Sequence, residues 1–352
     1  MITMALFNNK GGVGKTTLVY HLSHMLQRMG HRVLAVDLDP QANLTAQFLD
    51  EDELGQLWDE EGDSASSAPK PFTFDVRPAR VKPGTGTMAT AIEPILEGVG
   101  DVVLVDPITI EDGLWILPGD VNLSVFEDRL SAAWPRSFLG RDIAALRTTT
   151  ALHRVIENAA RSVRAEIVLI DVGPNLGAIN RAALLSADTL LIPLSADLFS
   201  LRGLRNLGPT LRDWRSTWQG TILPNIPERI SAPRGLMMPI GYIIMQSPAR
   251  SDRPSKAHDR WLDRIPEIFA ESVLATGANK VERSFEIATM KHYSTLMPLA
   301  QDARKPMFEL RAGDGALGGT QSAVRRCFSD FRELAIKIRE RLAYIDPTLR
   351  RF

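Results

Sequence analysis

A glycine-rich segment near the start of the chain restricts the possible folds more than any other feature. It runs from Asn9 to Thr17 with the sequence NKGGVGKTT, between an apolar run at residues 3–7 and a stripe of apolar side chains with helical spacing at Leu18, Leu22, Met25 and Met29. Glycines let the backbone curl so that several N–H groups point at one ligand, and a following helix adds the positive end of its dipole there. A turn without chemistry is the alternative, but the order strand, loop and helix favours a phosphate-binding loop.

The loop also carries side chains suited to a nucleotide and its metal ion. Lys15 is placed to reach the β- and γ-phosphates, and the Thr16 hydroxyl is placed to bind Mg²⁺. The residues predicted to surround the phosphates are Gly11, Gly12, Val13, Gly14, Lys15, Thr16 and Thr17.

Three carboxylates follow predicted strands elsewhere in the chain. Asp37 and Asp39 come after the apolar run at residues 32–36, and their i, i+2 spacing at the end of a strand points both side chains the same way. In an open parallel sheet, ligands bind at that edge. Asp171 follows the apolar run at residues 167–170, a pattern typical of a strand whose terminal Asp binds Mg²⁺ through water. For the first pair, the alternative is a turn before the proline that follows Asp39.

The remaining apolar runs predict a wound α/β fold. Runs typical of buried strands recur at residues 102–105, 114–117, 189–193 and 240–245, a helix is expected around 140–162, and a C-terminal amphipathic helix is expected at 321–345. Strands that alternate with helices favour a mostly parallel β-sheet flanked by helices, as one domain over residues 1–352. The wide gap between Lys15 and Asp171 indicates an insertion near residues 50–112, on the surface and acidic at its start, with a loop or flexible link at 60–71.

Composition excludes several other classes of protein. The 41 Lys and Arg residues balance 42 Asp and Glu residues, which excludes a uniformly basic nucleic-acid coat but not a local basic patch. Residues 321–352 hold eight Lys and Arg against four acidic residues, so the rest of the chain is net acidic. The single cysteine, Cys327, excludes a disulfide framework, is expected to be a small core residue and fits a reducing cytosol. No apolar run approaches the roughly 18–20 residues of a membrane-spanning helix, and no signal peptide is expected.

The phosphate loop departs from the common spacing, because Asn9 stands where glycine is usual and a second lysine, Lys10, precedes the glycine pair. In this it resembles the deviant Walker A loop of the ParA/MinD family of ATPases, which have a P-loop NTPase fold. The segment VDLDPQ at residues 36–41 is similar to the VDxDPQ segment of that family, and Gly173-Pro174 after Asp171 is similar as well. The resemblance covers residues 1–49, 112–130 and 165–205.

The resemblance implies a mechanism. Lys10 would cross to the phosphates of a partner subunit, so that ATP joins two copies in a sandwich homodimer. Asp37 would help to hold the Mg²⁺ shell together with Thr16 and Asp171, and Asp39 would position the attacking water. Lys10, Lys15 and Asp39 are thus the implied catalytic residues, with ATP and Mg²⁺ as cofactors.

The resemblance also implies partners. The ATP-bound dimer would bind DNA without sequence preference, and a ParB-like protein or another cargo adaptor would stimulate slow hydrolysis, for DNA segregation or cargo positioning. Such a protein is cytoplasmic and is associated with the nucleoid when ATP is bound. The arginines that could contact DNA phosphates are Arg202, Arg205, Arg212, Arg215, Arg325, Arg326, Arg339 and Arg341.

Three other functions stay open. A MinD-like ATPase that dimerises on membranes needs a basic amphipathic tail. Residues 333–341 have a basic face, but Phe328, Phe331, Ile338 and Leu342 suit a core helix better, so a membrane partner is not expected. A biosynthetic enzyme similar to dethiobiotin synthetase would bind a small acid beside the nucleotide and would not need Lys10 in trans. A regulatory or defence protein would dock another protein on the acidic insertion.

Metal sites other than that for Mg²⁺ are not expected. His21 and His24 lie at i, i+3 on the first helix without an evident third ligand, which favours ordinary helix residues. Relatives with an iron–sulfur cluster at the dimer interface need more cysteine than this chain has.

Overall fold

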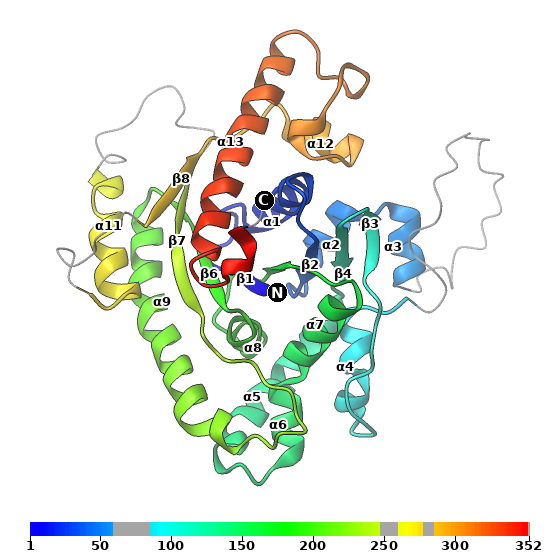
Figure 1. Ribbon diagram of the computed structural model, residues 1–352, viewed down its shortest axis with the longest axis vertical. Coiled ribbons are helices and arrows are strands. Elements are labelled where there is room, and N and C mark those ends of the chain that lie inside the picture. The colour runs from blue at the N-terminus through cyan, green and yellow to red at the C-terminus, as the bar shows by residue number, and fades with distance from the viewer. Residues whose placement is uncertain (59–84, 247–259, 277–284, 351–352) are drawn as a thin grey trace.

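The computed structural model describes residues 1–58, 85–246, 260–276 and 285–350, and these form one eight-stranded sheet between two layers of helices (Figure 1). The strand order is β3-β4-β2-β5-β1-β6-β7-β8. Only the edge strand β3 runs antiparallel to its neighbour, and every other pair in this sheet is parallel. The predicted wound, mostly parallel sheet is confirmed. Its strands are β1 (Ile2–Leu6), β2 (Val33–Asp37), β3 (Ile108–Glu111), β4 (Leu114–Leu117), β5 (Ile167–Asp171), β6 (Thr189–Ser195), β7 (Met238–Met245) and β8 (Glu286–Met290).

The central strands are buried on both faces because each face is covered by its own set of helices. On β5, Val168 and Ile170 point to one core, and Ile167 and Leu169 point to the other. Each such side chain, fully removed from water, contributes about 1.5–3 kcal/mol. The helices α4 (Met88–Glu97), α5 (Phe126–Arg136), α7 (Ala151–Ser162), α8 (Ala178–Ser186) and α9 (Leu198–Thr217) cover the first face, and α1 (Lys15–Arg28) and α13 (Gly319–Leu342) cover the second (Figure 1).

Shorter helices complete the fold at its margins. They are α2 (Asn43–Phe48), α3 (Glu51–Leu57), α6 (Ile143–Thr149), α11 (Ile265–Ile268) and α12 (Met297–Ala303), with 3₁₀ helices at Val121–Val125 and Met307–Glu309. No helix in the described part of the chain is both long and apolar enough to cross a membrane.

Two local predictions are wrong. Residues 102–105 pair with no strand, because Val103 donates its N–H to the carbonyl of Ala91 in the first turn of α4 (2.9 Å) and Leu104 is 72% exposed. The helix expected around 140–162 divides into α6 and α7 at Thr150. In this threonine-rich stretch the side-chain hydroxyls of Thr149 and Thr150 donate to carbonyls one turn back, which competes with regular helix bonding.

The segment at residues 50–112 is not simply a surface insertion. In its described part, α4 buries Met88 and Ile92 completely in the first core. The acidic start has a structural role, because the side chain of Asp50 accepts from Glu53 N and that of Glu53 accepts from Asp50 N, a capping box that begins α3. The predicted loop at 60–71 lies outside the described residues.

The predicted C-terminal helix is confirmed as α13. Its apolar stripe, including Cys327, Phe331 and Ile338, is buried against the second core. Cys327 is therefore the small core residue that the sequence predicts.

Candidate functional site

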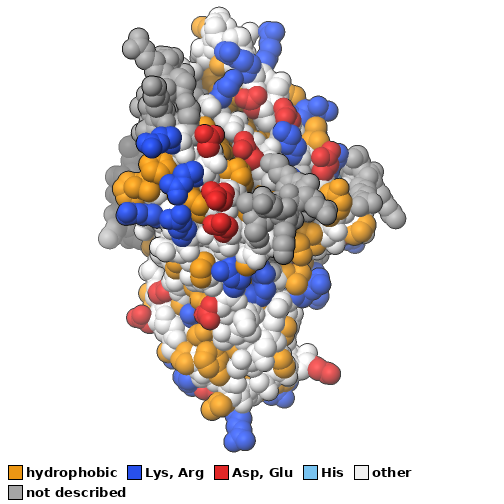
Figure 2. Space-filling view, turned by 90° about the vertical axis from the view of Figure 1, so that its left-hand side faces the viewer, with side chains coloured by type: hydrophobic (Ala, Val, Ile, Leu, Met, Phe, Trp, Pro, Cys, Tyr) orange, Lys and Arg blue, Asp and Glu red, His pale blue; other side chains and the backbone are white. Residues whose placement is uncertain are grey.

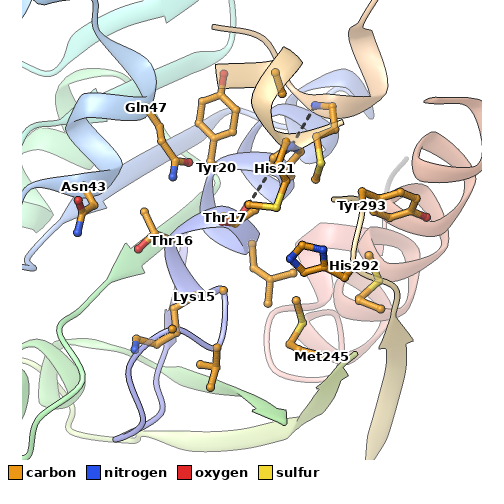
Figure 3. A pocket seen from close by; sticks show the side chains of 18 of the residues that line it. Lys15, Thr16, Thr17, Tyr20, His21, Asn43, Gln47, Met245, His292 and Tyr293 are labelled. Atoms are coloured by element: carbon orange, nitrogen blue, oxygen red, sulfur yellow. Dashed lines mark hydrogen bonds between the residues drawn. The ribbon is translucent and has the colours of Figure 1, made fainter. Parts of the chain in front are cut away.

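The predicted site residues meet at the carboxyl ends of three neighbouring strands. In the sheet, β5 lies between β2 and β1, so Asp171 is opposite both Asp37 and Leu6, the last residue of β1 before the phosphate loop. A cavity of about 1280 Å³ opens there (Figure 3). Its lining includes all the predicted phosphate-binding residues together with Lys10 and Asp39, whereas Asp37 and Asp171 are fully buried behind it.

The phosphate loop is shaped by glycine and ends in the first turn of α1. Gly12 and Gly14 have φ angles of 72° and 84°, a left-handed region where other residues are strained. The ammonium of Lys15 donates to the loop carbonyls of Asn8 (3.3 Å) and Lys10 (3.5 Å). Burial lowers the pKa of Lys15, and the nearby Asp171 and Asp39 oppose this shift. The loop therefore holds the ammonium group of Lys15 against its own carbonyls.

Asp171 has the properties of a cation ligand. It is fully buried, and neither carboxylate oxygen has a hydrogen bond of standard geometry among the described residues, although the Thr16 hydroxyl lies close enough to lower its pKa. Burial, and then the neighbouring Asp37, raise the pKa of Asp171 to about 8, while Thr16 and Lys15 act in the opposite direction. A buried carboxylate without partners is costly unless a cation compensates it. Together with the Thr16 hydroxyl it offers the hard oxygen ligands that Mg²⁺ prefers, so these residues fit the ion.

Asp37 differs, because its carboxylate is already satisfied by the protein. One oxygen accepts from the N–H and the hydroxyl of Thr45 (both 2.8 Å), and the other accepts from the N–H of Asp39 (3.2 Å). Burial raises the pKa of Asp37 to about 6 against these hydrogen bonds. The Thr45 hydroxyl in turn accepts from Gly119 N, next to β4. Asp37 thus fixes the loop that carries Asp39, and its metal role stays a prediction.

Asp39 faces the cavity beside the loop that follows β5. Its Oδ1 accepts from Gln41 N, and a Cβ atom on Gly173 would lie only 3.5 Å from that oxygen. The two loops are therefore neighbours at the mouth of the cavity. The same loop is anchored by Asn180, whose amide donates to the Gly173 carbonyl, and by Glu127, which accepts two N–H groups at the start of α8.

Lys10 is paired within its own chain. Its ammonium lies 2.5 Å from the carboxylate of Asp197, at the start of α9. Sequence reasoning missed Asp197, as it missed Thr45, because neither belongs to a recognisable motif.

The cavity wall beside the phosphate loop is mixed, because Gln246 and Lys291 line it together with methionine and aromatic side chains. It comes from the ends of β7 and β8, where Met245 and Met290 are opposite each other, followed by His292 and Tyr293 (Figure 3). On the near side, His21 of α1 bonds the Thr17 carbonyl through Nδ1 (2.7 Å) and accepts from Met307 N through Nε2 (3.0 Å). No cluster of three or more potential metal-binding His, Cys, Asp or Glu side chains occurs in the described part of the chain.

The candidate DNA-contacting arginines fall into two groups. Arg212 and Arg215 donate to the backbone carbonyls of Ser272 and Met237, and Arg341 lies over the ring of Phe285. These side chains have structural contacts, and Arg339 is half-buried. The exposed candidates are Arg202, Arg205, Arg325 and Arg326.

Comparison with known proteins identifies a family and several relatives of this chain. A protein-family model described as an AAA domain matches residues 1–222. The chromosome partitioning protein ParA of Caulobacter vibrioides is 29% identical over 214 residues, which cover 61% of this chain and 63% of that protein. The match thus spans less than two thirds of that relative's length.

Solved structures share the fold over nearly the whole chain. A protein of Corynebacterium diphtheriae superposes with a TM-score of 0.67 at 24% identity, covering 97% of this chain and 99% of that one. A variant of McdA from Cyanothece in complex with ATP has a TM-score of 0.54 at 19% identity, covering 94% of this chain and 96% of that one.

Proposed function

The chain belongs to the AAA-domain family matched over residues 1–222, within the ParA/MinD group of P-loop ATPases, and we propose that it is a ParA-like ATPase switch. In this scheme ATP joins two copies into a sandwich dimer, the dimer binds DNA without sequence preference, and hydrolysis separates the copies. A ParB-like protein or another cargo adaptor stimulates the slow hydrolysis. The protein acts in the cytoplasm, and its ATP-bound form is associated with the nucleoid.

The observation that carries the proposal is the buried carboxylate of Asp171, which has no hydrogen bond of standard geometry among the described residues and lies beside a complete phosphate loop. The loop N–H groups bind the triphosphate, and the ammonium of Lys15 turns from the loop carbonyls to the phosphate oxygens. Thr16 and Asp171 would hold Mg²⁺, and Asp37 would help to hold the shell around it. When bound, this ion neutralises charge on the β- and γ-phosphate oxygens.

Asp39 is suited to orient the attacking water. It lines the cavity, and the anchored loop at Gly173 fixes the space beside it. The water oxygen forms a bond to the γ-phosphorus as the bond to the β–γ bridging oxygen breaks, giving ADP and phosphate. The wall with Met245, Met290 and His292 would contact the base.

DNA binding would use separate basic groups rather than one continuous surface. On the side of the molecule seen in Figure 2, Lys and Arg side chains gather in groups with Asp and Glu between them. Arg202 and Arg205 on α9 are exposed, as are Arg325 and Arg326 on α13. Such contacts bind phosphates without reading sequence. The alternative of a membrane-binding tail is disfavoured, because the apolar stripe of α13 is buried in the core.

One observation favours a second candidate, an ATP-dependent enzyme acting on a small acid. The cavity volume of about 1280 Å³ exceeds the roughly 300–1,000 Å³ typical of small-molecule sites. It continues past the phosphate loop to Gln301 and Arg304 at the end of α12. Such an enzyme would not need Lys10 to act across a dimer.

Light scattering with size exclusion separates the two functions. Wild type and Lys10→Ala are compared with ATP and with ADP, and Lys337→Ala, which changes an exposed lysine paired with Glu333 on α13, is the control. We expect ATP-specific dimers of wild type and Lys337→Ala, and monomers of Lys10→Ala. Hydrolysis by a Lys10→Ala monomer at the wild-type rate would favour the enzyme.

DNA binding is tested with nonspecific duplex DNA over a salt series, with ADP or a non-hydrolysable ATP analogue. Binding should require the ATP analogue. The logarithm of the binding constant should fall with the logarithm of salt concentration, with a slope of about −0.9 for each phosphate contacted. Equal binding with both nucleotides would contradict an ATP-controlled DNA switch.

A further inference from the structure

The side chain that would act across the dimer is held by its own subunit. Lys10 Nζ lies 2.5 Å from Asp197 Oδ2, and the two side chains are 33% and 25% exposed. The backbone around Lys10 is fixed as well. Its N–H donates to the side-chain oxygen of Asn8 (3.0 Å), and the Asn8 amide donates to the carbonyl of Pro193 in β6 (2.6 Å).

Asp197 also begins α9. Its Oδ1 accepts from the N–H of Ser200 (2.9 Å), so that one carboxylate both caps the helix and binds Lys10. Burial alone would raise the pKa of Asp197, but the hydrogen bonds from Lys10 and Ser200 outweigh burial and leave the pKa below its usual value. The carboxylate is therefore ionised at neutral pH.

The start of α9 is packed tightly on the phosphate loop. A Cβ atom on Gly203 would lie 2.6 Å from the side-chain oxygen of Asn9, so this contact requires glycine. The Lys10–Asp197 pair therefore joins two elements that are already in contact.

We propose that Asp197 is a positioning residue that keeps Lys10 on its own subunit until a second ATP-loaded copy offers a stronger anion. The inference rests on the proposed function, since it concerns the same dimer. One ammonium group cannot contact Asp197 and a partner's phosphates together, so dimerisation must break the pair in both subunits. The triphosphate of the partner carries more negative charge than the Asp197 carboxylate, so it displaces this carboxylate from the ammonium group of Lys10. ADP lacks the γ-phosphate and therefore competes less well with the Asp197 carboxylate for Lys10. This difference favours ATP as the nucleotide that causes dimerisation.

The variant Asp197→Asn distinguishes the two roles of Asp197, the ion pair with Lys10 and the cap of α9. Asparagine caps helices about as well as aspartate does, so this variant keeps the start of α9 and loses the charge. Asp197→Ala loses both. Asp213→Asn, on the exposed side of the same helix, is the matched control.

The first readout uses the nucleotide-free protein. Lys10 acylation by an amine-reactive reagent is followed by peptide mass spectrometry. We expect Lys10 to react several-fold faster in Asp197→Asn than in wild type and Asp213→Asn. Equal rates in all three proteins would overturn the inference, whether or not the protein dimerises.

The second readout is the ATP concentration that gives half-maximal dimerisation. Two pairs break for each dimer, and an ion pair of this exposure contributes at most about a factor of five. Asp197→Asn should therefore need roughly 2–20-fold less ATP than wild type. A higher requirement would show that Asp197 assists the dimer itself, and would overturn the inference. Wild type that stays monomeric with saturating ATP would contradict the proposed function instead.

Discussion

Asp37 and Asp171 occupy opposite positions at the ends of neighbouring parallel strands, yet of the two only the Asp37 carboxylate accepts hydrogen bonds of standard geometry from the described residues. The two acids are equally buried. Their environments nevertheless differ, because Asp37 accepts hydrogen bonds from Thr45 and Asp39, whereas the proposed role of Asp171 is to bind a cation. Each should therefore fail differently when its charge is removed.

Asp171→Asn should keep the fold and lose the effect of Mg²⁺ on nucleotide affinity. Removal of an acid that binds the ion through water is expected to lower affinity for the ion by about 10–100-fold. Nucleotide titrations with Mg²⁺ and with EDTA measure this. Asp37→Asn should instead lower the thermal midpoint, because the bonds to Thr45 are disturbed. If the two variants behaved alike, the division of roles would be wrong.

Asp39→Ala should bind ATP and stay dimeric while hydrolysis falls about 10²-fold or more, in the range for loss of a group that handles the proton of the attacking water. Phosphate release at saturating ATP gives the rate, and light scattering gives the oligomeric state. Lys15→Ala is the contrast, because it should lose nucleotide binding itself. A monomeric Asp39→Ala in ATP would count against the scheme.

The buried His21 should make the protein less stable to unfolding at acid pH. Burial lowers the pKa of His21 to about 3 from the usual 6.5, so below about pH 6.5 the unfolded chain binds a proton that the native protein does not. The free energy of unfolding should therefore fall as the pH decreases from 6.5 towards 3, by about 1.4 kcal/mol per pH unit from this group. Protonation would also remove the acceptor for Met307 N.

Urea unfolding at pH 7 and pH 5 measures the effect. Wild type should lose about 2 kcal/mol more than His21→Gln between these values, since about 1.5 pH units lie below 6.5. An equal pH dependence in the two proteins would exclude His21 as the source.

Gly208→Ala should destabilise the fold strongly. A Cβ atom there would lie 1.8 Å from the carbonyl oxygen of Ser272, and backbone must move to accommodate it. Overpacking of this kind costs roughly 1–3 kcal/mol. Gly55→Ala in α3 is the matched control, because nothing lies within 4 Å of its Cβ position, and alanine favours a helix by up to about 1 kcal/mol. Thermal unfolding of both variants is the measurement.

The parts of the site that could be predicted are those written in one short stretch of sequence. The phosphate loop follows β1, Asp37 ends β2 and Asp171 ends β5. Because these three strands are neighbours in the sheet, the loop and the two acids lie close together. The residues that form hydrogen bonds and ion pairs with these groups are not next to them in the sequence. Thr45 and Gly119 meet around Asp37, and Asp197 reaches Lys10 across 187 positions. No local pattern marks such contacts.

The misassigned elements have a physical reason too. Four apolar residues at 102–105 are too few to distinguish a strand from a segment that packs beneath a helix. The edge strand β8 was missed because its sequence, EIATM, is partly polar and half of it faces solvent. Edge strands lack the continuous run of apolar residues by which a central strand is recognised in a sequence.

The packing of His21 has a consequence for any shortened version of this protein. Its ring stacks on Phe331 of α13, and its Nε2 binds the backbone at Met307, so the helix that begins at the phosphate loop depends on the last third of the chain. The segment matched by the family model ends at residue 222, before β7, β8 and α13. A fragment cut there would expose the free edge of β6 and the apolar flank of α1 to water. We therefore expect that the segment at residues 1–222 does not fold on its own, and that a shortened version of the protein must retain α13.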